Sequence, residues 1–273
     1  MCPIELKTQN IEAICLKTHS YSEADTIAHI YSSEYGKSSV IVKGAKKTKS
    51  KLAGACQLFS VNLLHVSLGQ SLYRLIQYQP VDHFLNIHNH LLKLAYALLY
   101  IELVYILQQD VDSEKIYTLL RGSLKVLNQC RESDLEITTH GLQFQLALLQ
   151  VSGTKPDFSQ CILTHQPFDQ FYPYYCFSPQ LGGITTAEQK KQFQKKNNKP
   201  DAEHSKASPW IQWVYVSNKT CALFLPQSKE VQETNHTLDA KAILKAQRFL
   251  QFYYQTVVEK PIQAYDLILS LLE

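Results

Sequence analysis

The stretch TIAHIYSSEYGKSSVIVK, Thr26 to Lys43, contains two short runs of β-branched and aromatic residues on either side of a polar turn. Such residues are typical of strands, and the turn at Glu34 to Lys37 contains a glycine. Similar runs precede this stretch at IEAICL and follow it at FSVNLLHVSL and SLYRLIQYQ, the last two separated by a turn at Gly69-Gln70. Five strands in about seventy residues predict a small barrel, and the five-stranded OB type is the expected form.

Five lysines occur in the next nine residues, the segment KGAKKTKSK from Lys43 to Lys51. The chain as a whole has 27 basic and 24 acidic residues and a formal net charge of +3, so this positive charge is local. The segment falls between the third and fourth strands, where a loop holds its charges over one surface that a polyanion can contact. The compact ammonium of lysine suits phosphate contact better than base readout. The segment therefore predicts contact with a nucleic-acid backbone, and the alternative is a loop that is merely solvated.

After Pro80 the hydrophobic period changes from two to about 3.6, which is typical of helices. Helices are expected at Leu91–Leu107, Ile116–Leu127 and Leu135–Val151, and Gly153 occupies the position of a C-terminal cap after the last of them. The apolar run at 91–107 contains Lys93 and Glu102, so it predicts a buried helix and not a membrane span.

The remaining sequence predicts an irregular insertion and a helical close. Residues 157–208 are rich in aromatic, Gln, Lys and Pro residues, and helices are expected at Ala240–Val258 and Tyr265–Leu272. The aromatic cluster Phe168–Phe177 could stack bases, although packing inside this insertion is the simpler interpretation. A second group of lysines, Lys190 to Lys199, is either a DNA contact or a solvated surface.

The expected architecture is α+β. The predicted domains are a barrel at residues 1–80, a helical domain at 81–157 and 209–273, and an insertion at 158–208. The N-terminal residues show no signal-peptide pattern, so a cytoplasmic, nucleoid-associated protein is expected. Seven cysteines without any C-x-x-C pair predict reduced thiols.

The motifs that usually indicate catalysis or nucleotide binding do not occur in this sequence. Gly36-Lys37-Ser38 resembles the end of a phosphate-binding loop, but Tyr31 stands where that motif needs its first glycine. The group His83, His88 and His90 has the wrong spacing for a helical metal pair, so solvated or capping histidines are expected. No known nucleophile motif is present, and a protein that is not an enzyme is predicted.

Three ordered blocks of sequence resemble the RecO family of bacterial recombination mediators. The first contains S-E-A-D at Ser22–Asp25, E-Y-G-K at Glu34–Lys37 and the basic segment up to Ala55, followed by Q-L-F at Gln57–Phe59 and L-Y at Leu72-Tyr73. The others are F-Q-L-A-L-L-Q-V-S-G-T-K-P-D at 144–157 with the following Cys161, and F-S-P-Q-L-G-G at 177–183, with a weaker similarity at K-P-I, 260–262.

This resemblance implies an OB barrel, a helical domain with a zinc-finger insertion, and a role that is not enzymatic. Such proteins bind single- and double-stranded DNA, anneal complementary strands, associate with RecR, and help RecA to replace single-strand binding protein. The basic loop of the family matches five lysines here, and Arg74 on the last strand extends the same surface. The candidate DNA-binding residues are Lys43, Lys46, Lys47, Lys49, Lys51 and Arg74.

The zinc site of the family is largely missing from this sequence. Many members carry two C-x-x-C pairs. Here Cys161 keeps the first cysteine of the first pair, but Thr164 stands at its second position, and Thr186 and Gln189 stand at the positions of the second pair. His165 and Cys176 do not restore the ligand spacing, so no zinc is predicted.

The interactions of the chain with proteins are less well defined by the sequence. Residues 132–154 contain no Lys or Arg, so the basic rim of a pocket for the acidic tail of single-strand binding protein has no candidate residues there. The alternative to a DNA-binding mediator is a scaffold that only docks proteins, and reversing the charges of the lysine loop would distinguish the two.

Overall fold

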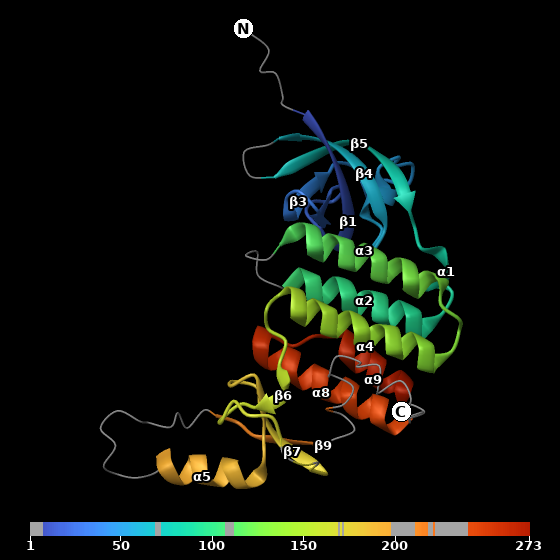
Figure 1. The fold of residues 1–273 in the computed structure, drawn as a ribbon. Helices are drawn as coiled ribbons and strands as arrows, with labels where there is room; N and C mark the ends of the chain where they lie inside the picture. The colour runs from blue at the N-terminus through green and yellow to red at the C-terminus, as the bar shows by residue number, and fades with distance from the viewer. Residues whose placement is uncertain are drawn as a thin grey trace. The chain divides into compact units, whose positions relative to one another are not determined.

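The structure is a computed structural model that describes residues 8–68, 72–106, 112–168, 170, 172–197, 211–217, 221 and 240–273. The chain forms two compact units, Met1–Ser152 with Ile262–Glu273, and Gly153–Pro261 (Figure 1). The predicted turn at Gly69-Gln70 lies outside the described residues.

The first unit begins with a closed five-stranded barrel. Its strands are β1 (Thr8–Ser20), β2 (Thr26–Ser32), β3 (Gly36–Val42), β4 (Val61–Leu68) and β5 (Tyr73–Asp82), in the order β1-β2-β3-β5-β4. The pairings are antiparallel except between β3 and β5, which run parallel and close the barrel. The predicted OB-type barrel and the α+β class are therefore confirmed.

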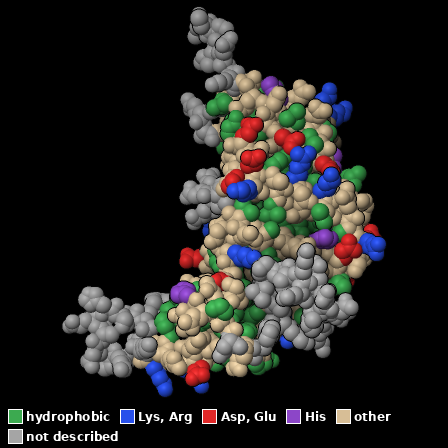
Figure 2. Space-filling model, viewed as in Figure 1, with side chains coloured by type: hydrophobic (Ala, Val, Ile, Leu, Met, Phe, Trp, Pro, Cys, Tyr) green, Lys and Arg blue, Asp and Glu red, His purple; other side chains and the backbone are tan. Residues whose placement is uncertain are grey.

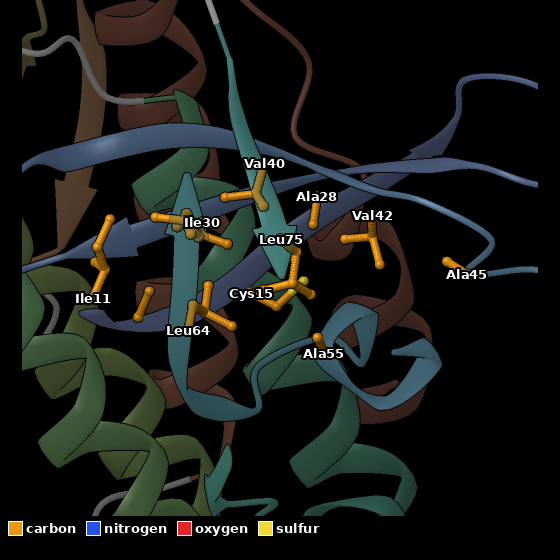
Figure 3. Close-up of a cluster of buried hydrophobic side chains, with 12 residues drawn as sticks. Ile11, Cys15, Ala28, Ile30, Val40, Val42, Ala45, Ala55, Leu64 and Leu75 are labelled. Atoms are coloured by element: carbon orange, nitrogen blue, oxygen red, sulfur yellow. The ribbon is translucent and has the colours of Figure 1, made fainter. Parts of the chain in front are cut away.

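Alternate side chains of these strands fill the barrel (Figure 3). The period of two places Ala28 and Ile30 of β2 and Val40 and Val42 of β3 inside, with Ala28 directly opposite Val40, and leaves the intervening residues on the outer face. Two residues from the segment between β3 and β4 join this core, namely Ala45 and Ala55, the latter from the short 3-10 helix η1 (Ala53–Cys56). The segment between β3 and β4, which contains the five lysines, is therefore attached to the barrel core near its start and near its end.

A bundle of helices completes the same unit. They are α1 (Leu85–His88), α2 (Leu91–Ile106), α3 (Ser113–Gln129), α4 (Asp134–Val151) and α9 (Ala264–Leu272). Glu12 of β1 accepts hydrogen bonds from Tyr117 and Arg121 of α3, both at 2.6 Å, which ties the barrel to the bundle. Gly153, just after α4, has a φ of 69°, as expected for a helix-terminating glycine.

The two charges within the apolar helix α2 have structural partners. Lys93 is 2% exposed and its ammonium donates to the carbonyl of Cys130 at 2.7 Å. The Glu102 carboxylate accepts the backbone N–H groups of Gln263 and Ala264 at 3.0 and 2.9 Å, which satisfies donors at the N-terminus of α9. No helix within the described part of the chain is long and apolar enough to cross a membrane.

The second unit contains more regular structure than the sequence predicted. A four-stranded sheet has the order β6-β8-β7-β9, and two helices accompany it. These elements are β6 (Asp157–Cys161), β7 (Tyr174–Ser178), β8 (Gly183–Thr185), α5 (Ala187–Asn197), β9 (Val214–Ser217) and α8 (Ala240–Val258).

Helix α8, which the sequence analysis grouped with the helical domain, belongs to this second unit in the structure. The reason is an aromatic cluster. Phe249 of α8 lies edge-on to Phe158 and Phe177, with ring centroids 5.8 and 4.8 Å away, and Tyr253 lies 5.5 Å from Phe177. Aromatic pairs at these distances add to the free energy of burial, so α8 is held by the sheet.

Gly141 of α4 allows the close approach of α2. A Cβ at this position would overlap the ring of Tyr96, which is fully buried. We expect Gly141→Ala to lower the free energy of unfolding by about 1–3 kcal/mol, because the overpacked ring outweighs the better helix propensity of alanine. Urea denaturation followed by circular dichroism measures the change.

Gly122 of α3 provides the control for this prediction. A Cβ there would meet nothing within 4 Å, so Gly122→Ala should stabilise by about 0.5–1 kcal/mol. Equal effects of the two substitutions would show that the helices do not pack as described.

Candidate nucleic-acid interface

The lysine loop, residues 43–51, follows β3 directly and leads into η1. Its five lysines, Lys43, Lys46, Lys47, Lys49 and Lys51, are all exposed. Arg74 of β5 is also exposed and pairs in register with Ile41 of β3, two residues before the loop begins. The structure therefore brings the start of the loop and Arg74 to neighbouring strands of the barrel.

A turn between β1 and β2 holds the first half of the loop. The two oxygens of the Asp25 carboxylate accept hydrogen bonds from the Lys43 ammonium at 2.7 Å and from the Gly44 N–H at 2.8 Å. Lys46 donates its ammonium to the Ser22 carbonyl at 2.7 Å and its backbone N–H to the Ala24 carbonyl at 3.0 Å. Two of the five lysines thus have a structural part in fixing the loop.

Asp25 is itself held in place by this turn and by its charge. Its backbone N–H donates to the Ser22 hydroxyl at 3.2 Å. The hydrogen bond from Lys43, followed by that from the Gly44 N–H, lowers the pKa of Asp25 from 3.8 to about 2. The ion pair therefore persists across the neutral and mildly acidic range, because the carboxylate stays charged.

The other three lysines of the loop, Lys47, Lys49 and Lys51, form no ion pair or hydrogen bond with Asp25. Backbone hydrogen bonds from Lys47 to the Gly44 carbonyl at 3.1 Å and from Ser50 to the Lys47 carbonyl at 2.9 Å shape the loop into consecutive turns. Among the ion pairs found in the described residues, none involves Lys47, Lys49 or Lys51. Their positive charges are therefore not neutralised within the described structure and can attract an anion.

The face of the molecule in Figure 2 carries basic and acidic side chains side by side. Among the residues drawn in colour there, basic and acidic groups alternate over the barrel and the helices, and neither sign forms an extended surface. This agrees with the small net charge of +3 and with a charge concentration that is local to the loop.

Two pairings of aromatic rings with lysines on the first unit have no role assigned from the sequence. Tyr21 is 58% exposed and its ring centroid lies 5.9 Å from the Lys43 ammonium, so an aromatic face stands beside the loop. Lys17 and Lys37 approach the ring of Tyr105 at 5.1 and 5.3 Å on the outer face of the barrel. The alternation of β1 and β3 could have placed these lysines outside, but it could not have found the tyrosine of α2.

Residues of the Gly36-Lys37-Ser38 segment and of the histidine group have structural roles in the fold. Gly36, the first residue of β3, has a φ of 58°, and Lys37 donates to the Tyr105 carbonyl at 3.0 Å. His88 lies 3.2 Å from the Gln57 amide and packs on Phe59. In the part of the chain that the structure describes, no three His, Cys, Asp or Glu residues are placed to hold a metal ion.

The described aromatic residues of the cluster at 168–177 pack on one another and on α8. The ring of Phe168 contacts those of Tyr172 and Tyr175, and Phe177 is fully buried, whereas Tyr174 is 61% exposed. In the second group of lysines, the Lys190 ammonium lies 5.8 Å from the Trp213 ring and 5.2 Å from the Tyr215 ring. Lys191 and Lys195 are exposed, and Lys199 lies outside the described residues.

The fold and the loop together define an OB-type barrel module with a basic loop, joined to a helical bundle. Residues 6–84 match the family described as Recombination protein O N terminal, and residues 88–200 match Recombination protein O C terminal.

Curated relatives agree with this match. The chain is 29% identical over 174 residues to the DNA repair protein RecO of Alkaliphilus metalliredigens, covering 63% of this chain and 68% of the relative. It is 31% identical over 185 residues to that of Bacillus mycoides, covering 67% and 71%. It is 33% identical over 164 residues to that of Gloeothece citriformis, covering 60% and 58%. The chain therefore belongs to the RecO family of DNA repair and recombination proteins.

Removal of the Asp25 carboxylate should release the lysine loop. We expect Asp25→Ala to speed the hydrogen exchange of the Gly44 and Lys46 amides at least tenfold, because both are held by this turn. In the unsubstituted protein the protection persists above the ordinary carboxyl pKa of 3.8 and is lost as the pH falls towards 2. Exchange measured by NMR or mass spectrometry tests both statements.

Glu23→Ala is the matched control, because Glu23 is an exposed carboxylate in the same turn. It should leave both amides protected. Equal exchange in the two variants would show that Asp25 does not anchor the loop.

Proposed function

We propose that this RecO family protein is a DNA-binding recombination mediator that is not an enzyme, and that its lysine loop binds the phosphate backbone of single- and double-stranded DNA. The observation that carries this proposal is the loop itself. Lys47, Lys49 and Lys51 are exposed and without an ion pair in the described structure, on a loop fixed to the barrel at Asp25 and Ala45.

The chemistry of the loop suits contact with phosphates of any sequence. Each ammonium is a point charge that replaces condensed counterions around the DNA, and this release favours binding at low salt. The loop contains no arginine, whose planar guanidinium is the usual reader of guanine edges. Preorganisation by the Asp25 turn reduces the entropy lost on binding.

The same chemistry supports strand annealing. Two complementary strands repel each other through their phosphates, and a protein that neutralises part of this charge allows them to meet. The exposed ring of Tyr21 beside Lys43 is placed where an unpaired base could stack on it. We propose that the loop and this ring hold single strands with their bases free to pair.

RecR, single-strand binding protein and RecA are proposed partners on the basis of family membership. With these partners the protein would promote RecA loading onto coated single strands, on the nucleoid in the cytoplasm. A cavity of about 320 Å³ between α3 and α4 is lined by apolar residues such as Leu119, Val126 and Phe144. No Lys or Arg is among the described residues that line it, so an acidic tail would find no basic rim there.

The triple variant Lys47→Glu, Lys49→Glu, Lys51→Glu tests the proposal. We expect its affinity for single-stranded DNA to fall at least tenfold, and the logarithmic salt slope to become shallower by about 2, because three phosphate contacts are lost. Annealing of complementary oligonucleotides should slow in parallel. Fluorescence anisotropy over a salt series and an annealing assay measure these effects.

The control is Lys125→Glu, Lys245→Glu, Lys260→Glu, which reverses three other exposed lysines and gives the same net charge. This variant should bind and anneal as the unsubstituted protein does. If both variants bind DNA equally well, the loop is not the interface. If the unsubstituted protein binds no DNA, the chain is a scaffold that docks proteins.

A further inference from the structure

The four positions where the RecO family resemblance places zinc ligands converge in the second unit. Cys161 ends β6, Thr164 lies in the turn that follows, Thr186 directly precedes α5, and Gln189 lies in the first turn of α5. The Gln189 Oε1 atom is 3.1 Å from the Cys161 Sγ and 3.1 Å from the Thr186 Oγ1. It is also 3.0 Å from the hydroxyl oxygen of Thr185, which itself lies 3.3 Å from the Cys161 Sγ.

Thr186 and Gln189 form a reciprocal helix cap. The Thr186 N–H donates to the Gln189 Oε1 at 3.3 Å, and the Gln189 N–H donates to the Thr186 Oγ1 at 3.2 Å. This is the geometry of a capping box, in which a Thr and a Gln three residues later satisfy each other's backbone donors. Thr186 and Gln189 therefore stand at the positions of the second C-x-x-C pair of the family, in the first turn of α5.

The Cys161 thiol lies at the centre of this arrangement and is 1% exposed. Burial alone would raise the pKa of this thiol, but hydrogen bonds with the side chains of Thr164 and Thr185 and with the backbone at Leu163 and Thr164 lower it. The turn after β6 thus directs its donors at the sulfur. We refer to Cys161, Thr164, Thr185, Thr186 and Gln189 as the polar cluster.

The polar cluster does not fit zinc. A structural zinc site needs four thiolate, imidazole or carboxylate ligands, whereas threonine hydroxyls and a carboxamide are poor substitutes. Within the residues that the structure describes, no three His, Cys, Asp or Glu side chains are placed to share a metal ion. Of the two nearby candidates, the Cys176 thiol interacts with Tyr215, and His165 belongs to no such group of three within the described residues.

We propose that the Gln189 carboxamide replaces the metal ion of the family, so that the second unit folds without zinc while its four positions keep the arrangement of a metal site. The Gln189 Oε1 atom accepts hydrogen bonds from Thr185 at the end of β8, from Thr186 at the cap of α5 and from the thiol of Cys161 in β6. These hydrogen bonds are shielded from water, because Thr185 is fully buried and Thr186 is 7% exposed. The inference is independent of the proposed function, which rests on the other unit.

The two tryptophans of the chain provide a selective reporter. Trp210 and Trp213 are the only ones in the sequence, and the described one, Trp213, belongs to the second unit. The ring of Trp213 lies 6.4 Å from that of Phe193 on α5. A thermal transition followed by tryptophan fluorescence therefore reports on the unit that contains the polar cluster.

The unsubstituted protein should contain no stoichiometric zinc by elemental analysis. Its fluorescence transition should occur at the same temperature with and without a chelator. One zinc per chain whose removal lowers this transition temperature would overturn the proposal.

Gln189→Ala should lower the temperature of the fluorescence transition by about 3–8 °C, because it removes the common acceptor and one half of the cap. Gln192→Ala is the matched control, since Gln192 is an exposed glutamine on the same helix. The two variants should differ clearly. Equal transition temperatures would show that the Gln189 carboxamide does not hold the unit together.

The restored site is a second, independent test. The variant Thr164→Cys, Thr186→Cys, Gln189→Cys should bind one zinc per chain. Its cobalt form should show the thiolate charge-transfer and d–d absorption of a tetrahedral site. Adding Cys161→Ser to this variant should weaken zinc binding at least tenfold. A folded triple variant that binds no metal would contradict the convergence of the four positions. If the triple variant fails to fold, the comparison of Gln189→Ala with Gln192→Ala decides whether the Gln189 carboxamide holds the unit together.

Discussion

The Asp25 carboxylate is the constraint on which the functional surface depends. It joins the turn between β1 and β2 to the first two residues after β3, through one charged and one backbone donor. Without this connection, five like charges in nine residues would repel each other and extend into solvent. With it, and with Ala45 buried in the barrel core, the loop keeps one conformation and presents Lys47, Lys49 and Lys51 outwards.

This arrangement divides the lysines by role. The ammonium groups of Lys43 and Lys46 form hydrogen bonds that fix the loop. The three later lysines form no such bonds within the described residues. A row of identical charges in a sequence cannot show this division, because it arises from contacts with residues some twenty positions earlier. The S-E-A-D segment was recognised as part of the family resemblance, but its physical function became visible only in the folded chain.

The barrel could be predicted because its strands are local and strongly patterned. The β2 strand occupies the predicted residues Thr26–Ser32, and Gly153 follows the end of α4 as predicted. The sheet of the second unit was missed because its strands are three to five residues long, and because β6 with β8 and β7 with β9 pair across long sequence separations. Such strands carry too few residues for a period to be recognised. The place of α8 depends on Phe249 and Tyr253 contacting Phe177, which lies far earlier in the sequence, and no local pattern encodes such contacts.

Chemical protection of lysines in the unsubstituted protein would show directly whether the lysine loop contacts the nucleic-acid backbone. Acetylation of each lysine would be quantified by mass spectrometry, with and without a saturating single-stranded oligonucleotide. We expect Lys47, Lys49 and Lys51 to become protected, while Lys125 and Lys245, which are also exposed and lie on helices, react as before. Unchanged reactivity of the three loop lysines in the saturated complex would contradict this expectation.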